Sequence, residues 1–416
     1  MRPPAGAALA AATILTLWGT DRPEPHWVVL NRAAHQAREA KDYPKLKDAL
    51  AELRPLLPGN PLVLYNLAAA EAHIGQLEQA LAELKDLASG GLIYDFNADA
   101  DFAILRGSPG FAAVLRQVER NREPVARAVP VSTLPERDLL PEDIAYDPPT
   151  RRFLIGSVAQ SKIVTADGRV FARTDWPVMA LRVDAARRIL WAAAGWVANC
   201  QHCDPADRDK TALLAFHLDS GRLLKRIDSP VKGLLGDMTI SRGGDLYVSG
   251  STYGAVLRLK ANSSTWERLD APGEFPSPQT PALSSDERTL YVPDYVRGIA
   301  AVDLKTHKAR WLQPANGIAL SGIDGFYRYG DAFLAVQNGV KPERVVLFSS
   351  GLTRQEVLEA NTPGLGEPTH GTLVGGVFYF IANTGWDAYD DDGKKKPDSA
   401  PVESQIRKIA LGGPPT

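Results

Sequence analysis

The fold of this chain is decided by two stretches, GDMTISRGGDLYVSGSTYGAVLRL at 236–259 and SPQTPALSSDERTLYVPDYVRGIAAVDL at 277–304. In each, an apolar strand is followed by a turn that contains Asp or Gly, a second strand (LYVSG or LYVPD) and a third strand. The second strands begin at Leu246 and Leu290, 44 residues apart, which is the length of one four-stranded propeller blade. The pattern therefore predicts a β-propeller.

The same pattern recurs six times between Pro141 and Leu411, so we expect a mainly β chain with a six-bladed β-propeller over residues 136–412. The stretch 129–134 precedes the first full blade. We expect it to lie beside 405–411 as the outer strand of the last blade, because that closure removes two free sheet edges. The inner strands are expected to begin near Ile144, Leu181, Met238, Ala282, Gly325 and Gly371.

Residues 26–121 have a helical period instead of a strand period. Tyr43 and Leu77 stand at equivalent positions 34 residues apart, which is the repeat length of tetratricopeptide helical hairpins. The break PGNP at 58–61 separates two such units, and SPGFAAVLRQVERN at 108–121 is expected to be a capping helix. We therefore expect a small tetratricopeptide-like helical domain, joined to the propeller by a linker and closing strand at 122–135. Such a domain either holds a protein partner in its concave face or only docks on the propeller.

The first twenty residues, MRPPAGAALAAATILTLWGT, combine one Arg with an apolar run of signal-peptide length. They predict a secretory signal or, if it is not cleaved, an N-terminal anchor. The folded part is therefore expected to be periplasmic or secreted. A formal net charge of −2 and the lack of a basic stripe argue against a nucleic-acid partner.

Polar side chains gather at one end of the predicted blades. In an antiparallel blade the first strand begins where the second strand ends, so both sets of residues line one mouth of the channel. Asp and Asn also cap their own turns, so each residue alone has a structural explanation. Together they offer oxygen ligands with a single imidazole, which predicts calcium or magnesium rather than zinc or copper. The residues are Glu142, Asp237, Gln279, Asp324, Glu367 and nearby His370 at the strand starts, and Ser157, Asp294, Gln337, Asn338 and Asn383 at the second-strand ends.

Four blade sequences also carry a family resemblance: the two stretches above, LLPEDIAYDPPTRRFLIGSV at 139–158 and LSGIDGFYRYGDAFLAVQNG at 320–339. Over about 270 residues the chain resembles the superfamily of senescence marker protein, gluconolactonase and luciferin-regenerating enzyme. In its catalytic members an axial metal is bound by a glutamate opening the first blade, asparagines opening two middle blades and an aspartate opening the fifth. Glu142 and Asp324 match the glutamate and the aspartate. Gly236, just before Asp237, and Gln279 stand where the asparagines are expected.

The resemblance implies a divalent metal, with calcium as the expected ion, and hydrolysis of a small lactone or ester. The water that attacks the substrate would be held or deprotonated by Asp324 or Glu367, with His370 as another candidate base. No G-x-S-x-G nucleophile elbow occurs, which argues against a serine hydrolase. The alternative, favoured by the missing asparagines, is a non-catalytic propeller that binds a small ligand on its axis and a protein partner through the helical repeats. The expected metal ligands are Glu142, Asp237, Gln279 and Asp324.

Cys200 and Cys203 are the only cysteines, in the sequence CQHC. A c-type haem site needs His directly after the second Cys, where Asp204 stands. Half of a zinc site with His202 or His217 lacks a second ligand pair. A local disulfide in the stretched loop of the second blade is the interpretation that an oxidising compartment favours.

Overall fold

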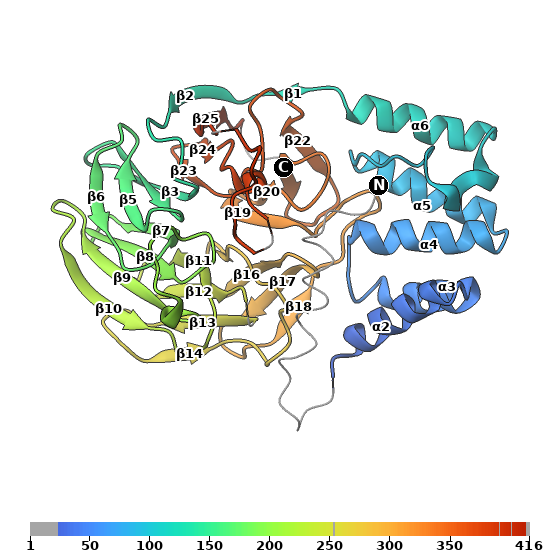
Figure 1. Ribbon diagram of the computed structural model, residues 1–416. Coiled ribbons are helices and arrows are strands. Elements are labelled where there is room, and N and C mark those ends of the chain that lie inside the picture. Colours follow the sequence, from blue (N-terminus) through green and yellow to red (C-terminus); the bar gives the residue numbers. More distant parts are fainter. Residues whose placement is uncertain (1–23, 253, 391, 401, 413–416) are drawn as a thin grey trace.

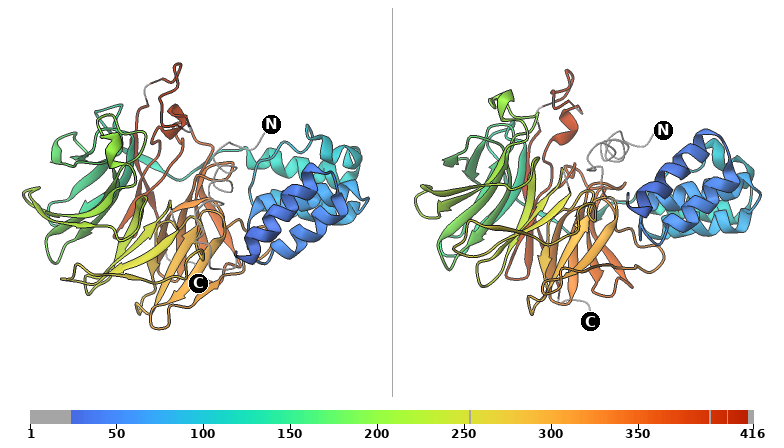
Figure 2. Two further views of the ribbon diagram at one scale, coloured as in Figure 1. Left: turned by 60° about the horizontal axis from the view of Figure 1, so that its bottom comes forward. Right: turned by 90° about the horizontal axis from the view of Figure 1, so that it is seen from below.

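The computed structural model describes residues 24–412 except 253, 391 and 401 (Figure 1). These residues form six antiparallel sheets arranged around one axis, which confirms the six-bladed β-propeller (Figures 1 and 2). Each blade begins with its innermost strand. The blades are β3 (Pro141–Asp147), β4 (Arg152–Ser157), β5 (Lys162–Thr165) and β6 (Val170–Arg173); β7 (Val178–Asp184), β8 (Ile189–Gly195), β9 (Thr211–His217) and β10 (Leu223–Asp228); β11 (Leu235–Ile240), β12 (Leu246–Gly250), β13 (Ala255–Leu259) and β14 (Trp266–Arg268); β15 (Ala282–Leu283), β16 (Thr289–Asp294), β17 (Gly298–Asp303) and β18 (Ala309–Trp311); β19 (Ile323–Tyr329), β20 (Ala332–Gln337), β21 (Arg344–Ser349) and β22 (Gln355–Ala360); and β23 (Gly371–Val374), β24 (Val377–Ile381) and β25 (Gln405–Ala410).

The main apolar contacts lie between neighbouring blades. Leu154 and Ile163 of the first blade, for example, pack with Leu181 and Leu190 of the second in one buried cluster. Alternate residues of each strand face opposite sides of the sheet, so both faces of a blade bury side chains against its neighbours. This packing fixes where each inner strand points its polar residues at the axis.

The inner strands of four blades contain a β-bulge near their first residues. Pairing with the second strand is irregular between Pro141 and Ile144 in β3 and between Leu235 and Met238 in β11. Strands β7 and β19 have the same irregularity. Several inner strands therefore begin up to three residues before the predicted starts, because the sequence pattern detects the regular pairing that resumes after the bulge. A bulge re-aims side chains, and here it turns polar residues towards the axis.

The segment before the first blade completes the ring. Strand β1 (Val125–Ala126) pairs with β22, and β2 (Val129–Thr133) forms the outer strand of the last blade beside β25. Between the two strands, the buried Glu359 side chain accepts hydrogen bonds from the backbone amides of Arg127 (3.0 Å) and Ala128 (2.9 Å). The first and last parts of the propeller segment thus share one sheet.

Two helical hairpins and a further helix precede the propeller. Tyr43 and Leu77, the two residues 34 positions apart, begin the second helix of each hairpin. Asn60 caps the second hairpin, because its Oδ1 accepts hydrogen bonds from the amides of Leu62 (2.9 Å) and Val63 (3.3 Å). The helices lie to one side of the propeller in all three views (Figures 1 and 2). They are α2 (His26–Glu39), α3 (Tyr43–Leu53), α4 (Pro61–His73), α5 (Leu77–Ser89), the 3-10 helix η2 (Ala100–Leu105) and α6 (Pro109–Asn121).

The helical region is held on the propeller by backbone contacts. The amide of Leu320 donates to the carbonyl of Gly59 (2.9 Å), and the buried guanidinium of Arg344 donates to the carbonyl of Gly90 (2.7 Å). A Cβ atom on Gly90 would lie 2.5 Å from the carbonyl oxygen of Gly317, so only glycine permits this approach. The contact surface adjoins the fourth and fifth blades.

The predicted signal or anchor at 1–20 lies outside the described residues. Within the described part of the chain, no helix combines the length and the apolar character needed to cross a membrane. Cys200 and Cys203 are joined by a disulfide in the loop between β8 and β9, as the sequence analysis favoured.

Candidate functional site

Four ionisable side chains from different blades meet at the mouth where the inner strands begin, which we call the axial mouth. Glu142 lies on β3, Asp237 on β11 and Asp324 on β19, each within the bulged part of its strand. His370 immediately precedes β23. We call these four residues the axial cluster.

His370 is the centre of the axial cluster. Its Nε2 lies 2.5 Å from Asp237 Oδ1 and 3.6 Å from Asp324 Oδ1. Its Nδ1 lies 3.1 Å from the backbone carbonyl oxygen of Glu142 and 3.9 Å from Glu142 Oε1. In the neutral form of His370, a proton on Nδ1 donated to that carbonyl would leave the Nε2 lone pair facing the two aspartates, which is how a metal-binding histidine is usually oriented.

In Glu142 and in Asp324, a hydrogen bond holds one oxygen of the carboxylate, and the other oxygen faces His370. The indole Nε1 of Trp386 donates to Glu142 Oε2 (2.6 Å). The amide Nδ2 of Asn338 donates to Asp324 Oδ2 (2.7 Å). Glu142 Oε1 and Asp324 Oδ1 are the oxygens that remain directed at His370, so the supporting residues determine which atoms can act as ligands.

Burial dominates the protonation of the axial cluster. It raises the pKa of Glu142 to about 8, with His370 opposing and Asp324 reinforcing the effect. It also raises the pKa of Asp324 to about 6, again opposed by His370 and reinforced by Asp237. Burial alone would lower the pKa of His370, but Asp237 and Asp324 raise it well above its usual range. A cation that entered the cluster would therefore displace protons.

The donor set fits a divalent cation. Ligand atoms of Glu142, Asp324 and His370 all lie within 4.8 Å of one another. Asp237 Oδ1 and His370 Nε2 form a buried ion pair when the imidazole is protonated, and within the described chain neither atom has another hydrogen-bond partner. An entering cation that displaced the imidazole proton would free both atoms to act as ligands.

The neighbouring Asp143 shows what the bulge does. Its Oδ2 accepts hydrogen bonds from the amide of Leu181 and from Arg182 Nη1, both at 2.8 Å. Asp143 therefore binds to the second blade, whereas Glu142, one residue earlier, faces the axis. A change of register by one residue would exchange the two carboxylates.

In the fourth blade, the predicted ligand Gln279 is followed by Thr280, which contacts Asp324. The amide Nε2 of Gln279 donates to Ser277, at 3.3 Å to its carbonyl and 3.0 Å to its hydroxyl. Thr280 is buried, its amide donates to the carbonyl of Asp324 (3.4 Å), and its hydroxyl has no hydrogen-bond partner in the described part of the chain. The sequence analysis missed Thr280, for which its position directly after the predicted ligand Gln279 is the signal in the sequence.

Glu367 belongs to a different group of carboxylates. Its amide donates to Glu343 Oε2 (2.5 Å), and Lys341 Nζ donates to the other oxygen of Glu343 (2.5 Å). Burial raises the pKa of Glu367 to about 7, and the Asp387 and Glu343 carboxylates add to the rise. Glu367 thus lies beside Glu343, not among the ligand atoms around His370.

Among the predicted second-strand residues, Asn338 is the one that hydrogen-bonds to the axial cluster. Asp294 instead accepts hydrogen bonds from the amides of Val296 (3.0 Å) and Arg297 (2.9 Å), which is the turn-capping role that was the alternative explanation. The remaining three hold loops or pack against backbone: Ser157 donates to Leu139, Gln337 donates to Ala319 and Ser321, and Asn383 lies against Gly366.

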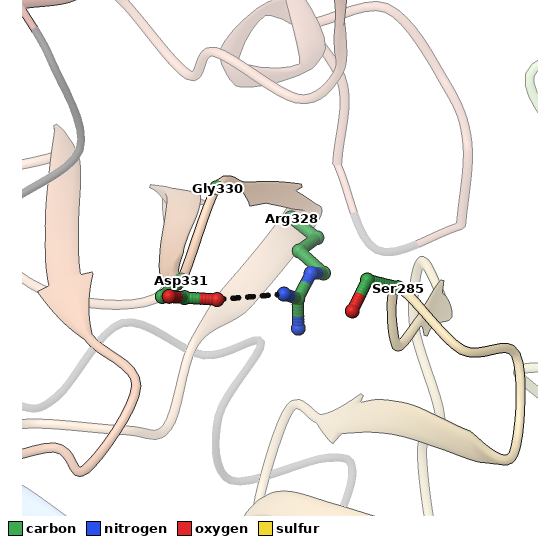
Figure 3. A pocket seen from close by; sticks show the side chains of 4 residues that line it. All are labelled: Ser285, Arg328, Gly330 and Asp331. Carbon is green, nitrogen blue, oxygen red and sulfur yellow. Dashed lines mark hydrogen bonds and ion pairs between the residues drawn. The ribbon is translucent and has the colours of Figure 1, made fainter.

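A separate cavity of about 480 Å³ lies at the opposite end of β19 (Figure 3). It is lined by Ser285, Arg328, Gly330 and Asp331, and Arg328 donates to Asp331 at 3.0 Å. Arg328 follows Asp324 by four residues on the strand, a separation of about 13 Å. The cavity is therefore distinct from the axial cluster.

A six-bladed propeller with carboxylates and a histidine buried on its axis is the class of protein that the fold and the cluster define. Solved structures with a similar fold include a gluconolactonase from Xanthomonas campestris, at 15% sequence identity with a TM-score of 0.45 over 69% of this chain and 98% of that chain. Luciferin-regenerating enzyme matches at 12% identity with a TM-score of 0.48, over 70% and 98% of the two chains. Virginiamycin B lyase from Staphylococcus aureus matches at 13% identity with a TM-score of 0.47, over 68% and 99%. No family model matches the chain, and no curated protein does.

Proposed function

We propose that this chain is an exported, divalent-metal-dependent hydrolase of small lactones or esters. The observation that supports the proposal is the axial cluster, in which Glu142, Asp324 and His370 offer ligand atoms within 4.8 Å of one another from three blades. The side chains are at most 13% exposed, so they are not the solvated carboxylates of an ordinary surface. Three buried carboxylates that share one imidazole as their ionic partner exceed the charge it can neutralise, and such clusters are usually part of a functional site.

The ion would be held by Glu142, Asp237, Asp324 and His370. When bound, a divalent cation polarises a substrate carbonyl and lowers the pKa of a coordinated water. Calcium is the ion expected from the carboxylate oxygens. The imidazole makes manganese and zinc its competitors, because nitrogen ligands favour transition metals over calcium.

The chain's own residues supply orientation and proton transfer. Trp386 and Asn338 orient the carboxylates of Glu142 and Asp324. Glu367, with a pKa of about 7 and a buried Oε2 that has no partner among the described residues, is suited to accept a proton from the attacking water at neutral pH. Asp324 is the other candidate for this role. Glu367→Gln distinguishes them, because it removes the carboxylate of Glu367 and leaves every proposed ion ligand in place: lost turnover with ion binding retained would assign the role to Glu367.

A binding function without catalysis is the second candidate. It is favoured by the low exposure of the axial side chains, 2% for Asp237 and His370, which limits the access of a substrate carbonyl to the cluster. In that case the axis would hold an ion or small ligand, and the helical region would contact a protein partner.

The test combines metal binding with turnover. Protein stripped of metal is titrated calorimetrically with calcium, magnesium, manganese and zinc, and a panel of lactones and aryl esters is assayed with each ion. Asp324→Asn should abolish both binding and turnover, whereas the matched variant Asp331→Asn, at the far end of the same hairpin, should keep both. Binding without turnover would establish the second candidate, and neither binding nor turnover at millimolar ion would reject the hydrolase.

A further inference from the structure

The loop between β16 and β17 lies between the helical region and the axial cluster. Its residues, 295–297, carry Tyr295 on one side and receive contacts from the helical region on the other. We infer that the helical region controls the ligand geometry of Asp324 through this loop, with Tyr295 and Asn338 as positioning residues. The inference rests on the proposed function, because it concerns the regulation of the same metal site.

The first step joins Tyr295 to Asp324. The Tyr295 hydroxyl donates to Asn338 Oδ1 (3.0 Å), and Asn338 Nδ2 donates to Asp324 Oδ2 (2.7 Å). The phenol therefore fixes which end of the Asn338 amide faces Asp324. Because Asp324 Oδ2 is bound in this way, Oδ1 is the oxygen that faces His370.

The second step is the close packing that keeps Tyr295 in place. A Cβ atom on Gly339 would lie 2.6 Å from both Cζ and the hydroxyl of Tyr295, so the ring rests directly on the glycine backbone. The carbonyl of Tyr295 accepts a hydrogen bond from the amide of Gly322 (2.8 Å), and the carbonyl of Gly322 accepts one from the amide of Gly339 (3.1 Å). Tyr295 is thus fixed to the loop before β19, the strand that carries Asp324, and to the loop after β20, which contains Asn338.

The third step joins the loop to the helices. Asn60 Nδ2 donates to the carbonyl of Val296 (2.9 Å) while Asn60 Oδ1 caps α4. Arg297 lies 5.7 Å from the ring of Trp27 of α2 and 4.0 Å from the ring of Trp311. A Cβ atom on Gly298 would lie 2.9 Å from the carbonyl of Pro58, so the first residue of β17 is also in close contact with the helical region.

Movement of α4 relative to the propeller would therefore move the backbone of Val296, the residue next to Tyr295. The route consists of three direct hydrogen bonds and one peptide link. The hydrogen bonds join Asn60 to Val296, Tyr295 to Asn338 and Asn338 to Asp324, and the peptide link joins Val296 to Tyr295. Anything that binds the helical region and shifts α2 or α4 would consequently alter the position of Asp324. The helical region thereby has a function at the site besides docking.

The test uses the full chain and removes one link at a time. Tyr295→Phe deletes the hydroxyl and keeps the ring. Its matched control is Tyr329→Phe, whose hydroxyl donates to the backbone carbonyls of Leu411 (3.3 Å) and Gly412 (2.8 Å) at the opposite end of the propeller. Asn60→Ser keeps a good N-cap for α4 but cannot reach Val296. Calcium dissociation constants should rise about tenfold for Tyr295→Phe, by a smaller factor for Asn60→Ser, and not at all for Tyr329→Phe.

A second readout does not depend on bound metal. The chain has seven histidines, so side-chain 15N spectra of metal-free protein can be assigned for His370 with the help of His370→Gln. Tyr295→Phe and Asn60→Ser should shift the His370 signals, because Asp324 moves relative to the ring, whereas Tyr329→Phe should leave them in place. Unchanged His370 signals in both variants overturn the inference. If the wild type binds no ion but these shifts occur, the proposed function fails and the coupling stands.

Discussion

Strand β3 carries a buried carboxyl group near each end, Glu142 at the axial mouth and Asp147 at the opposite end. Asp147 accepts hydrogen bonds from Arg188 at 2.6 and 3.0 Å and from the Thr150 hydroxyl at 2.6 Å. Burial alone would raise the pKa of Asp147, but these partners and Arg152 bring it below its usual range, whereas burial raises the pKa of Glu142 to about 8. Arginine therefore neutralises the buried carboxylate at one end of β3. At the other end, the carboxylate of Glu142 is neutralised by a proton or is available to a cation.

The difference teaches how to separate structural from functional carboxylates in this fold. The Asp147 end joins the first blade to the second through Arg188, which also pairs with Asp219. The Glu142 end meets three more ionisable side chains and no arginine or lysine among its direct partners in the described chain. A buried acid with a matched cation holds blades together, and a buried acid without one is a candidate ligand.

The largest effect is expected at the structural end. Asp147→Ala should lower the free energy of unfolding by about 3 kcal/mol, because it leaves Arg188 and Arg152 without their shared partner and removes a link between two blades. Denaturant unfolding measures the change. Calcium affinity at the axis should remain that of the wild type, and a loss of calcium binding in this variant would contradict the separation of the two ends.

The second effect concerns the axial end of β3. In the metal-free protein, removing the carboxylate there should not lower the free energy of unfolding, in contrast to Asp147→Ala. Glu142→Gln keeps an acceptor for Trp386 and removes a buried carboxyl, so the metal-free variant should be at least as stable as the wild type. Calcium at about a hundred times its dissociation constant should stabilise the wild type by about 2.7 kcal/mol, and this gain should be absent from the variant. Thermal melts with and without calcium test both statements. A destabilised metal-free variant would show that Glu142 is structural, like Asp147.

Much of this arrangement could be predicted from the sequence. The spacing of the blades predicts the fold, and the antiparallel pairing of their strands predicts that Glu142, Asp237, Asp324 and His370 lie at one mouth of the channel. Those positions could be predicted because each lies at a fixed distance in sequence from a strand, and the apolar pattern of that strand identifies it.

The remaining parts depend on contacts that no local pattern encodes. Trp386, which orients Glu142, is 244 residues away in the chain and lies in an insertion between β24 and β25. That Thr280, and not the adjacent Gln279, contacts the backbone of Asp324 is a difference of one register position in a blade whose inner strand is only two residues long. The hydrogen bond from Asn60 to Val296 joins residues that are 236 positions apart in the chain, so the sequence could suggest docking of the helical region but not its path to Asp324.

The disulfide loop should have a smaller effect than either end of β3. Cys200 and Cys203 enclose a loop with a sequence separation of three, so closing it removes at most about 2 kcal/mol of unfolded-state entropy in the chain-entropy model. We expect mild reduction, or Cys200→Ser with Cys203→Ser, to lower the melting temperature only slightly and to leave calcium binding unchanged. Thiol labelling of exported, unreduced protein checks that the bond forms in the cell, and two freely reactive thiols would contradict it.

The smallest effect is expected from a third kind of buried acid, Glu71 of α4 in the helical region. It is buried, its Oε2 has no hydrogen-bond partner in the described residues, and burial, with Glu83 adding to it, raises its pKa to about 7. Because this value lies above that of an unfolded Glu, the protonated form is favoured on folding. The contribution of protonated Glu71 to the free energy of unfolding is therefore complete below pH 4.5, and it is lost as the pH rises through 7.

Glu71→Gln should accordingly stabilise the helical region at pH 8 by about 1 kcal/mol and have little effect at pH 4. Hydrogen exchange of the α4 amides reports this locally, without requiring the propeller to unfold in the same step. The exposed Glu52 of α3 provides the matched control, since Glu52→Gln should change α4 protection at neither pH. Equal protection of α4 in wild type and Glu71→Gln at pH 8 would mean that Glu71 finds a cation there, and it would then belong with Asp147 rather than with Glu142.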